Sequence, residues 1–144
     1  QTFVQMAPTP ALLNTWSAIL AANTEEETLR QLLNALVVFP PGTQGLKQKG
    51  QFTALAYQNL LGRPATKAEQ QAALALLAQG PGELTNALQT GSEGRKYAAK
   101  VYLDSRLHRK PKAGELALLV TGGLDLRALR VQIESGNEYF DAGY

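Results

Sequence analysis

The sequence contains no cysteine and only one histidine, His108. Without cysteine the chain can form neither disulfide bonds nor thiolate metal sites, and a lone histidine lacks the companion ligands that zinc requires. Aromatic residues make up 7% of the chain and β-branched residues are also sparse, so strands are poorly supported. No apolar run approaches the roughly 20 residues that a membrane-spanning helix needs. These shortages leave helices as the expected secondary structure.

What is abundant agrees with helices, because leucine and alanine lose little on entering one. The 144 residues suit one domain or two small repeats that share a core. The formal net charge of +2 is too small to define a partner. No signal peptide is visible, and the start at Gln1 instead of Met predicts a processed or excised piece of a longer chain.

Capping residues and leucine spacing predict the helices of the N-terminal half. Thr9-Pro10 begins the first helix, and Thr24 begins the second, with Glu27 completing a predicted capping box. A polar loop is expected over 39–50, followed by a helix over 51–61 that Gly62 closes in a left-handed conformation. The apolar stripe of the first helix is expected to contain Leu12, Leu13, Trp16, Ile19 and Leu20.

In the C-terminal half, Thr66 and Glu69 form a second predicted capping box, for a helix closed by Gly80. The remaining helices are expected at 83–90, from Ser92-Glu93 to about 107, at 115–121, at 125–134 and as a last turn at 137–140. In the long helix that starts at Ser92, the expected inward stripe is Tyr97, Val101 and Tyr102.

An internal repeat runs through this half. The stretch 74–80 matches 116–122 without a gap, and the step at 61–64 parallels 107–111. The period is roughly 40 to 55 residues, and helical repeats of that size bury their apolar faces by stacking. The sequence therefore predicts an all-α helical bundle of stacked repeats, compact overall, with a diverged first unit plus loop at 1–50, a second unit at 51–91 and a third at 92–144.

The repeat motifs resemble the bacterial family catalogued as domain of unknown function 4214. The match covers about 52–140 and is carried by an opening step and a closing step, which contain Tyr57, Gly62, Arg63, Pro64, Ser92, Glu93, Ser135 and Glu138. In the last unit His108 stands in place of the glycine, so that helix end need not have the same geometry. The resemblance implies a helical module of secreted or cell-surface bacterial proteins without known catalytic residues. The Leu-Gly-Arg step is also reminiscent of phycobilisome linker domains, which are helical assembly modules.

No group of residues predicts catalysis. Ser92 and Ser135 lie beside glycines, which helix capping explains better than a nucleophile held by a base. The glycine-rich steps lack the Lys-Ser/Thr of a phosphate-binding loop, and the acids near Asp125 and Asp141 are too scattered for a recognised calcium loop. We therefore expect no enzyme activity, no cofactor and no bound metal.

Two arginines recur at one position of the repeat, Arg63 and Arg109. We expect each to hydrogen-bond carbonyls at the preceding helix end or to pair with an acid, in preference to binding a ligand.

The strongest charge asymmetry lies between residues 95 and 112, where Asp104 is the only acid. The cations of this segment are Arg95, Lys96, Lys100, Arg106, Arg109, Lys110 and Lys112. Such a patch could hold an acidic protein, an anionic glycan or nucleic acid, and a merely solvated face is equally open.

The favoured function is a non-enzymatic structural, assembly or adhesion module of a secreted or cell-surface bacterial protein. It would present helical faces to a protein or glycan partner, with the 95–112 segment and the 39–50 loop as contact surfaces. One alternative is a nucleic-acid-binding protein that uses the basic 95–112 patch, and another is an accessory domain whose catalytic partner lies outside this segment.

Overall fold

A computed structural model describes residues 9–141 of the chain, so positions 1–8 of the first predicted unit and 142–144 of the third lie outside the described residues. Within this range there are nine α-helices and no strand, which confirms the predicted all-α class. Each of these helices is too short or too polar to span a bilayer. The helices are α1 (Pro10–Ala22), α2 (Glu25–Leu36), α3 (Gly42–Leu61), α4 (Lys67–Gln79), α5 (Pro81–Thr90), α6 (Ser92–Leu107), α7 (Glu115–Thr121), α8 (Leu126–Glu134) and α9 (Asn137–Asp141).

The two predicted capping boxes have different outcomes. At the start of α4, the Thr66 side chain accepts from the Glu69 amide and the Glu69 carboxylate accepts from the Thr66 amide, which confirms the box. At the start of α2, Thr24 accepts from the Glu27 amide as expected. The Glu27 carboxylate, however, accepts two hydrogen bonds from Arg30, so the second half of that box is not formed.

The predicted loop over 39–50 is wrong, because α3 already begins at Gly42. Pro41 occupies the N-cap position, and Gly45 allows the chain to double back closely. A Cβ atom on Gly45 would lie 1.7 Å from the carbonyl oxygen of Pro40. Gly45 therefore serves a close backbone contact inside a helix, and the contact surface predicted at 39–50 lies largely on the first turns of α3.

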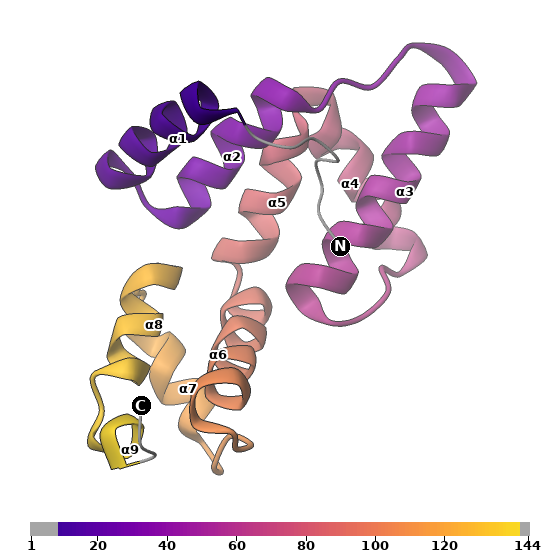
Figure 1. The fold of residues 1–144 in the computed structure, drawn as a ribbon. Helices are drawn as coiled ribbons and strands as arrows, with labels where there is room; N and C mark the ends of the chain where they lie inside the picture. The colour runs from indigo at the N-terminus through magenta and orange to yellow at the C-terminus, as the bar shows by residue number, and fades with distance from the viewer. Residues whose placement is uncertain (1–8, 142–144) are drawn as a thin grey trace.

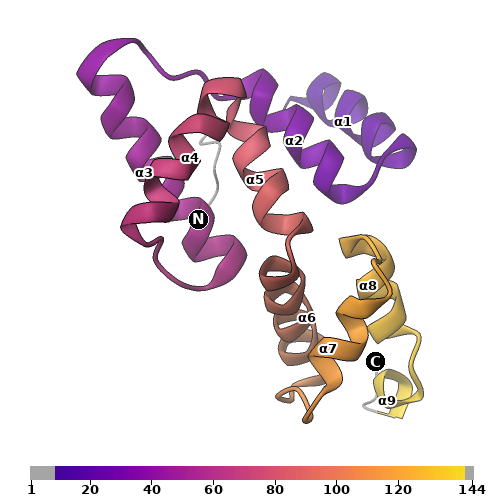
Figure 2. The same cartoon turned by 180° about the vertical axis from the view of Figure 1, so that it is seen from behind.

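Buried side chains form two separate hydrophobic cores. The first core consists of Leu33, Phe52, Ala56, Tyr57, Leu61, Ala73, Leu77 and Leu84. The second core consists of Ala99, Leu103, Leu126, Leu129 and Ile133. Figures 1 and 2 show α1–α5 as one body and α6–α9 as another, with α6 following directly on α5. The third predicted unit thus has a core of its own, whereas the first core draws residues from both preceding units.

Two predicted apolar stripes are not buried as expected. No residue of α1 is buried, and Leu13 and Leu20 are 52% and 40% exposed. In α6 the buried face contains Ala99 and Leu103. Tyr97 and Tyr102 are half-buried, and Tyr102 packs against the second core, whereas Val101 is 42% exposed. Periodicity identifies the apolar side of a helix but does not tell whether a neighbouring element covers that side.

The helices α3 and α6 end in the same way although the residue differs. Gly62 has a φ of 70° and His108 a φ of 48°, both in the left-handed region. The ring of Tyr97 covers Gly62 so closely that a Cβ atom there would lie 2.2 Å from Tyr97 Cε2. Gly62 is therefore required both for its backbone conformation and for the approach of α6.

The close approach of Tyr97 predicts a difference between two glycine substitutions. Gly62→Ala should destabilise the protein by about 2–4 kcal/mol, because alanine is strained at positive φ and its methyl group displaces the ring. Gly114 also has a positive φ, of 77°, but no atom lies within 4 Å of a Cβ built there. Gly114→Ala should therefore cost only the backbone strain, about 1 kcal/mol. Urea unfolding measures both losses, and equal losses would contradict the role given to Tyr97.

Candidate functional site

Arg63 joins three helices at the end of α3, in a group that we call the first clasp (Arg63, Glu69, Glu93). Its Nη1 and Nη2 atoms donate to Glu69 of α4 at 2.9 and 2.7 Å. Its Nε and Nη2 atoms donate to Glu93 of α6 at 2.5 and 2.8 Å. Nη1 also donates to the carbonyl of Pro64 at 3.2 Å. One guanidinium fork thus fixes the end of α3 to the starts of α4 and α6.

Arg109 forms a second clasp at the end of α6 (Arg109, Glu115, Glu138). It donates to Glu115 of α7 at 2.8 and 2.7 Å and, through Nη2, to Glu138 of α9 at 2.7 Å. Its Nε atom also donates to Glu138, and its Nη1 atom donates to the carbonyl of Lys110 at 3.1 Å. In both clasps the arginine and the first glutamate are six residues apart. The acid partners expected from the sequence are present at each arginine, whereas the carbonyl that each one reaches belongs to the following residue and not to the preceding helix end.

The clasps keep their carboxyl groups charged. Hydrogen bonds from Arg63 lower the pKa of Glu69 from 4.5 to about 2 and lower the pKa of Glu93. Hydrogen bonds from Arg109 lower the pKa of Glu115 from 4.5 to about 2 and lower the pKa of Glu138. These carboxylates are ionised and bonded near neutral pH, which suits structural anchors better than groups that must exchange protons.

The lowered pKa values predict a loss of stability in acid. Because Glu69 and Glu115 bind protons more weakly when folded, their stabilisation is complete above about pH 4.5 and is lost as the pH falls towards 2. The melting temperature should fall over this window. The fall should be shallower in Arg63→Gln/Arg109→Gln, which lacks both guanidinium groups. Circular dichroism melts at stepped pH measure the slopes. The control is Arg127→Gln, because no carboxylate partner of Arg127 is found within residues 9–141, and parallel slopes in all three proteins would refute the assignment.

The cations predicted for partner binding are mostly paired with acids from outside their own segment. The pairs are Arg95 with Glu26 at 4.0 Å, Arg106 with Glu134 at 3.0 Å, Arg109 with Glu115 at 2.7 Å and Lys112 with Glu138 at 3.8 Å. Arg95 also donates to the carbonyl of Thr90 at 3.1 Å, and its side chain is only 15% exposed. The expectation that these cations face only Asp104 is therefore wrong, because a count along the segment cannot include acids that folding brings to it.

Four of the predicted cations nevertheless line one depression, which we call the basic groove. It lies between α6 and the loop to α7, has a volume of about 710 Å³, and is lined by Tyr97, Lys100, Val101, Asp104, Arg109, Lys110, Pro111, Lys112, Ala113 and Leu116. Three lysines and Arg109 contribute the positive charge of its lining, and Asp104 contributes one negative charge. Val101 and half-buried Leu116 contribute apolar surface. The second clasp fixes Arg109 and so holds the loop that lines one side of the groove. Lys96, Arg95 and Arg106 do not line it.

The two serines singled out in the sequence do not cap helix starts with their side chains. The N-cap of α6 is Gly91, no side chain caps this helix start, and Ser92 is the first helical residue. Ser135 is the C-cap of α8, and its hydroxyl donates to the carbonyl of Gln132 at 3.3 Å. Among the described residues, no group of three or more His, Cys, Asp or Glu side chains could hold a metal ion.

A buried glutamate that the sequence did not reveal connects the two cores. Glu26 is 3% exposed, and its Oε1 atom accepts from the amide of Leu126, the first residue of α8, at 2.9 Å. Beside it, Glu25 accepts from Arg130 at 2.7 Å. From the local sequence alone, the acids at the start of α2 are expected to interact with the dipole of that helix. Their contacts with α8 bridge about a hundred residues of chain, and no local pattern indicates such partners.

Removal of the Glu26 carboxylate should destabilise the folded protein. Glu26→Ala leaves the Leu126 amide without its acceptor and Arg95 without its nearest carboxylate, so we expect a loss of about 2–4 kcal/mol. Glu26→Gln keeps one acceptor oxygen and should lose less. Glu25→Ala removes a more exposed ion pair and should cost about 1 kcal/mol or less. Chemical denaturation of the three variants measures each loss in the free energy of unfolding. Equal losses in Glu25→Ala and Glu26→Ala would contradict the expected order.

The comparisons with known proteins give no relative. No family model matches the chain, and the searches of curated proteins and of solved structures also return no match. The resemblance to domain of unknown function 4214 therefore stays a prediction.

Proposed function

We propose that this chain is a non-enzymatic assembly module of stacked helical repeats that holds an acidic, amphipathic segment of a partner protein in the basic groove. The observation that carries the proposal is the convergence of four predicted cations on a groove that also exposes apolar surface. In line with the family resemblance, we place the module in a secreted or cell-surface bacterial protein.

The clasps support the repeat part of the proposal. Arg63 and Arg109 use the same atoms on equivalent glutamates, and each clasp residue recurs 45 or 46 residues later in the chain. Helix α6 takes part in both clasps, as the third helix of the first and the leading helix of the second. The first clasp attaches the second unit to the third, and the second clasp fixes the helices within the third unit in the same way, which suits a module that holds its surfaces in a fixed arrangement.

The composition of the groove favours a protein segment over the other anionic partners. Nucleic acid is held chiefly through cations that neutralise phosphates, and four of the seven cations of the 95–112 segment are paired with carboxylates. Lys100 and Lys110 have no carboxylate within 4 Å in the part of the chain that the structure describes. Beside them lies Val101, which an amphipathic segment would cover and an anionic glycan would not use.

A labelled helical peptide with glutamates on one face and leucines on the other tests the groove. Fluorescence anisotropy should show saturable binding to the wild type. The charge-reversed variant Lys100→Glu/Lys110→Glu should bind about tenfold or more weakly, because it replaces attraction by repulsion at the groove. Val101→Ser should also lower the affinity for the peptide, because it removes an apolar contact.

The matched control is Lys67→Glu/Arg127→Glu, which changes the net charge equally at exposed positions away from the groove. If the control weakens binding as much as the groove variant does, attraction is a property of the whole surface and the proposal fails. If heparin or duplex DNA binds more tightly than the peptide and Val101→Ser has no effect, a glycan or nucleic acid replaces the protein segment as partner.

A further inference from the structure

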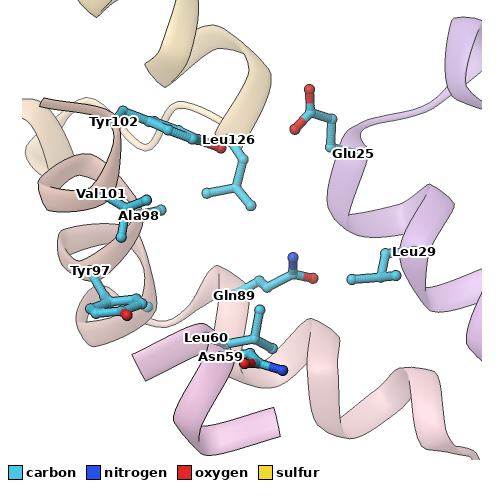
Figure 3. Close-up of a pocket in the computed structure, with 11 residues that line it drawn as sticks. Glu25, Leu29, Asn59, Leu60, Gln89, Tyr97, Ala98, Val101, Tyr102 and Leu126 are labelled. Carbon is cyan, nitrogen blue, oxygen red and sulfur yellow. The ribbon is translucent and has the colours of Figure 1, made fainter. Parts of the chain in front are cut away.

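A second depression, which we call the junction hollow, lies between the two cores. It has a volume of about 350 Å³ and receives side chains from helices of both bodies. Figure 3 shows Leu29 of α2 facing Ala98 and Val101 of α6 across it, with Gln89 of α5 between them. Its other lining residues are Glu25, Asn59, Leu60, Gly94, Tyr97, Tyr102 and Leu126.

Gln89 is the unusual member of this lining. The residue is only 8% exposed, and its Oε1 atom is buried without a hydrogen-bond partner among the described residues. Two further buried atoms also have no hydrogen-bond partner among the described residues, Glu26 Oε2 and Arg95 Nη1. Their side chains form the ion pair that joins α2 and α6. A buried acceptor without a donor is destabilising, and each such group in a folded protein calls for an explanation. At Gln89, a bound molecule with an N–H or O–H group would supply the missing hydrogen bond.

The charges around the hollow indicate a neutral occupant. Glu25 is paired with Arg130 at 2.7 Å, and Glu26 lies 4.0 Å from Arg95. A charged ligand would find no unpaired counter-ion in this lining, and a buried unpaired charge is costly. Apart from Gln89 and the amide of Asn59 at one edge of the lining, the walls are mainly aliphatic side chains and two tyrosine rings, against which an apolar or aromatic body packs well.

We propose that the junction hollow binds a small, neutral, largely apolar molecule whose N–H or O–H group donates a hydrogen bond to Gln89 Oε1. The volume of the hollow lies at the lower end of the roughly 300–1,000 Å³ of small-molecule sites, which fits a compound with one or two rings. A molecule in this position contacts α2, α3, α6 and α8 together and braces the two bodies against each other.

Indole and indene test the proposal as a matched pair of probes. They have nearly the same shape, but only indole carries an N–H donor. Two-dimensional NMR titration of the full chain should show saturable binding of indole with shifts at the hollow, and about tenfold weaker binding of indene, as expected for one lost hydrogen bond. Indole should also raise the melting temperature.

The variant Gln89→Met separates the hydrogen bond from the shape of the site. Methionine has a similar length without a strong acceptor, so this variant should fold, melt at a higher temperature than the wild type without ligand, and bind indole and indene equally. The control Gln132→Met, on an exposed position of α8, should keep the preference for indole. The proposal is overturned if the wild type binds the two probes equally, if Gln89→Met keeps the preference, or if indole shows no saturable binding up to its solubility. Gln89 does not line the basic groove, so the result for Gln89→Met does not depend on whether the groove binds the peptide.

Discussion

The guanidinium forks of Arg63 and Arg109 determine how the chain turns where α3 and α6 end. After α3 and after α6 the backbone enters a left-handed conformation and leaves the helix, and apolar packing alone leaves the direction of the next helix poorly defined. A planar fork with donors in fixed directions removes that freedom, because it must meet two carboxylates from two further helices at once. The placement of Tyr97 over Gly62 and of the loop beside the basic groove both follow from this constraint.

The junction between the two cores depends on a different balance of forces. Each core is held by excluded apolar surface, whereas the contact between them includes a buried glutamate, an ion pair at 2.7 Å and three polar atoms without partners. Directional polar contacts specify a single orientation but add little net stability. The orientation of the two bodies is thus fixed by a few bonds, and this region should open more easily than either core.

The sequence predicted what is encoded locally. Capping by Thr9, the box at Thr66 and the glycine ends of helices depend on neighbours within a turn, so the helices from α4 onwards fall close to their predicted positions. The sequence did not predict contacts between residues that are far apart in the chain. Examples are the burial of Glu26 against α8 and the acids that pair with the 95–112 cations. The leucine match of 74–80 with 116–122 is offset by 42 residues, four fewer than the arginine spacing of 46. Four residues are about one helical turn, so a leucine stripe looks alike in both registers, and only the clasps define the correct one.

The binding surface shows why a charged residue cannot be assigned to a partner from its sequence alone. Arg109 lines the basic groove, yet its donors are occupied by Glu115, Glu138 and a backbone carbonyl, so it shapes the groove more than it charges it. The attraction left for a partner comes mainly from the lysines. Tyr97 and Val101 line both the groove and the junction hollow, and α6 therefore forms a common wall of the two depressions. A partner in the basic groove and a molecule in the junction hollow would both contact α6. If binding at one site changes the affinity of the other, the change in binding free energy must be the same in both directions.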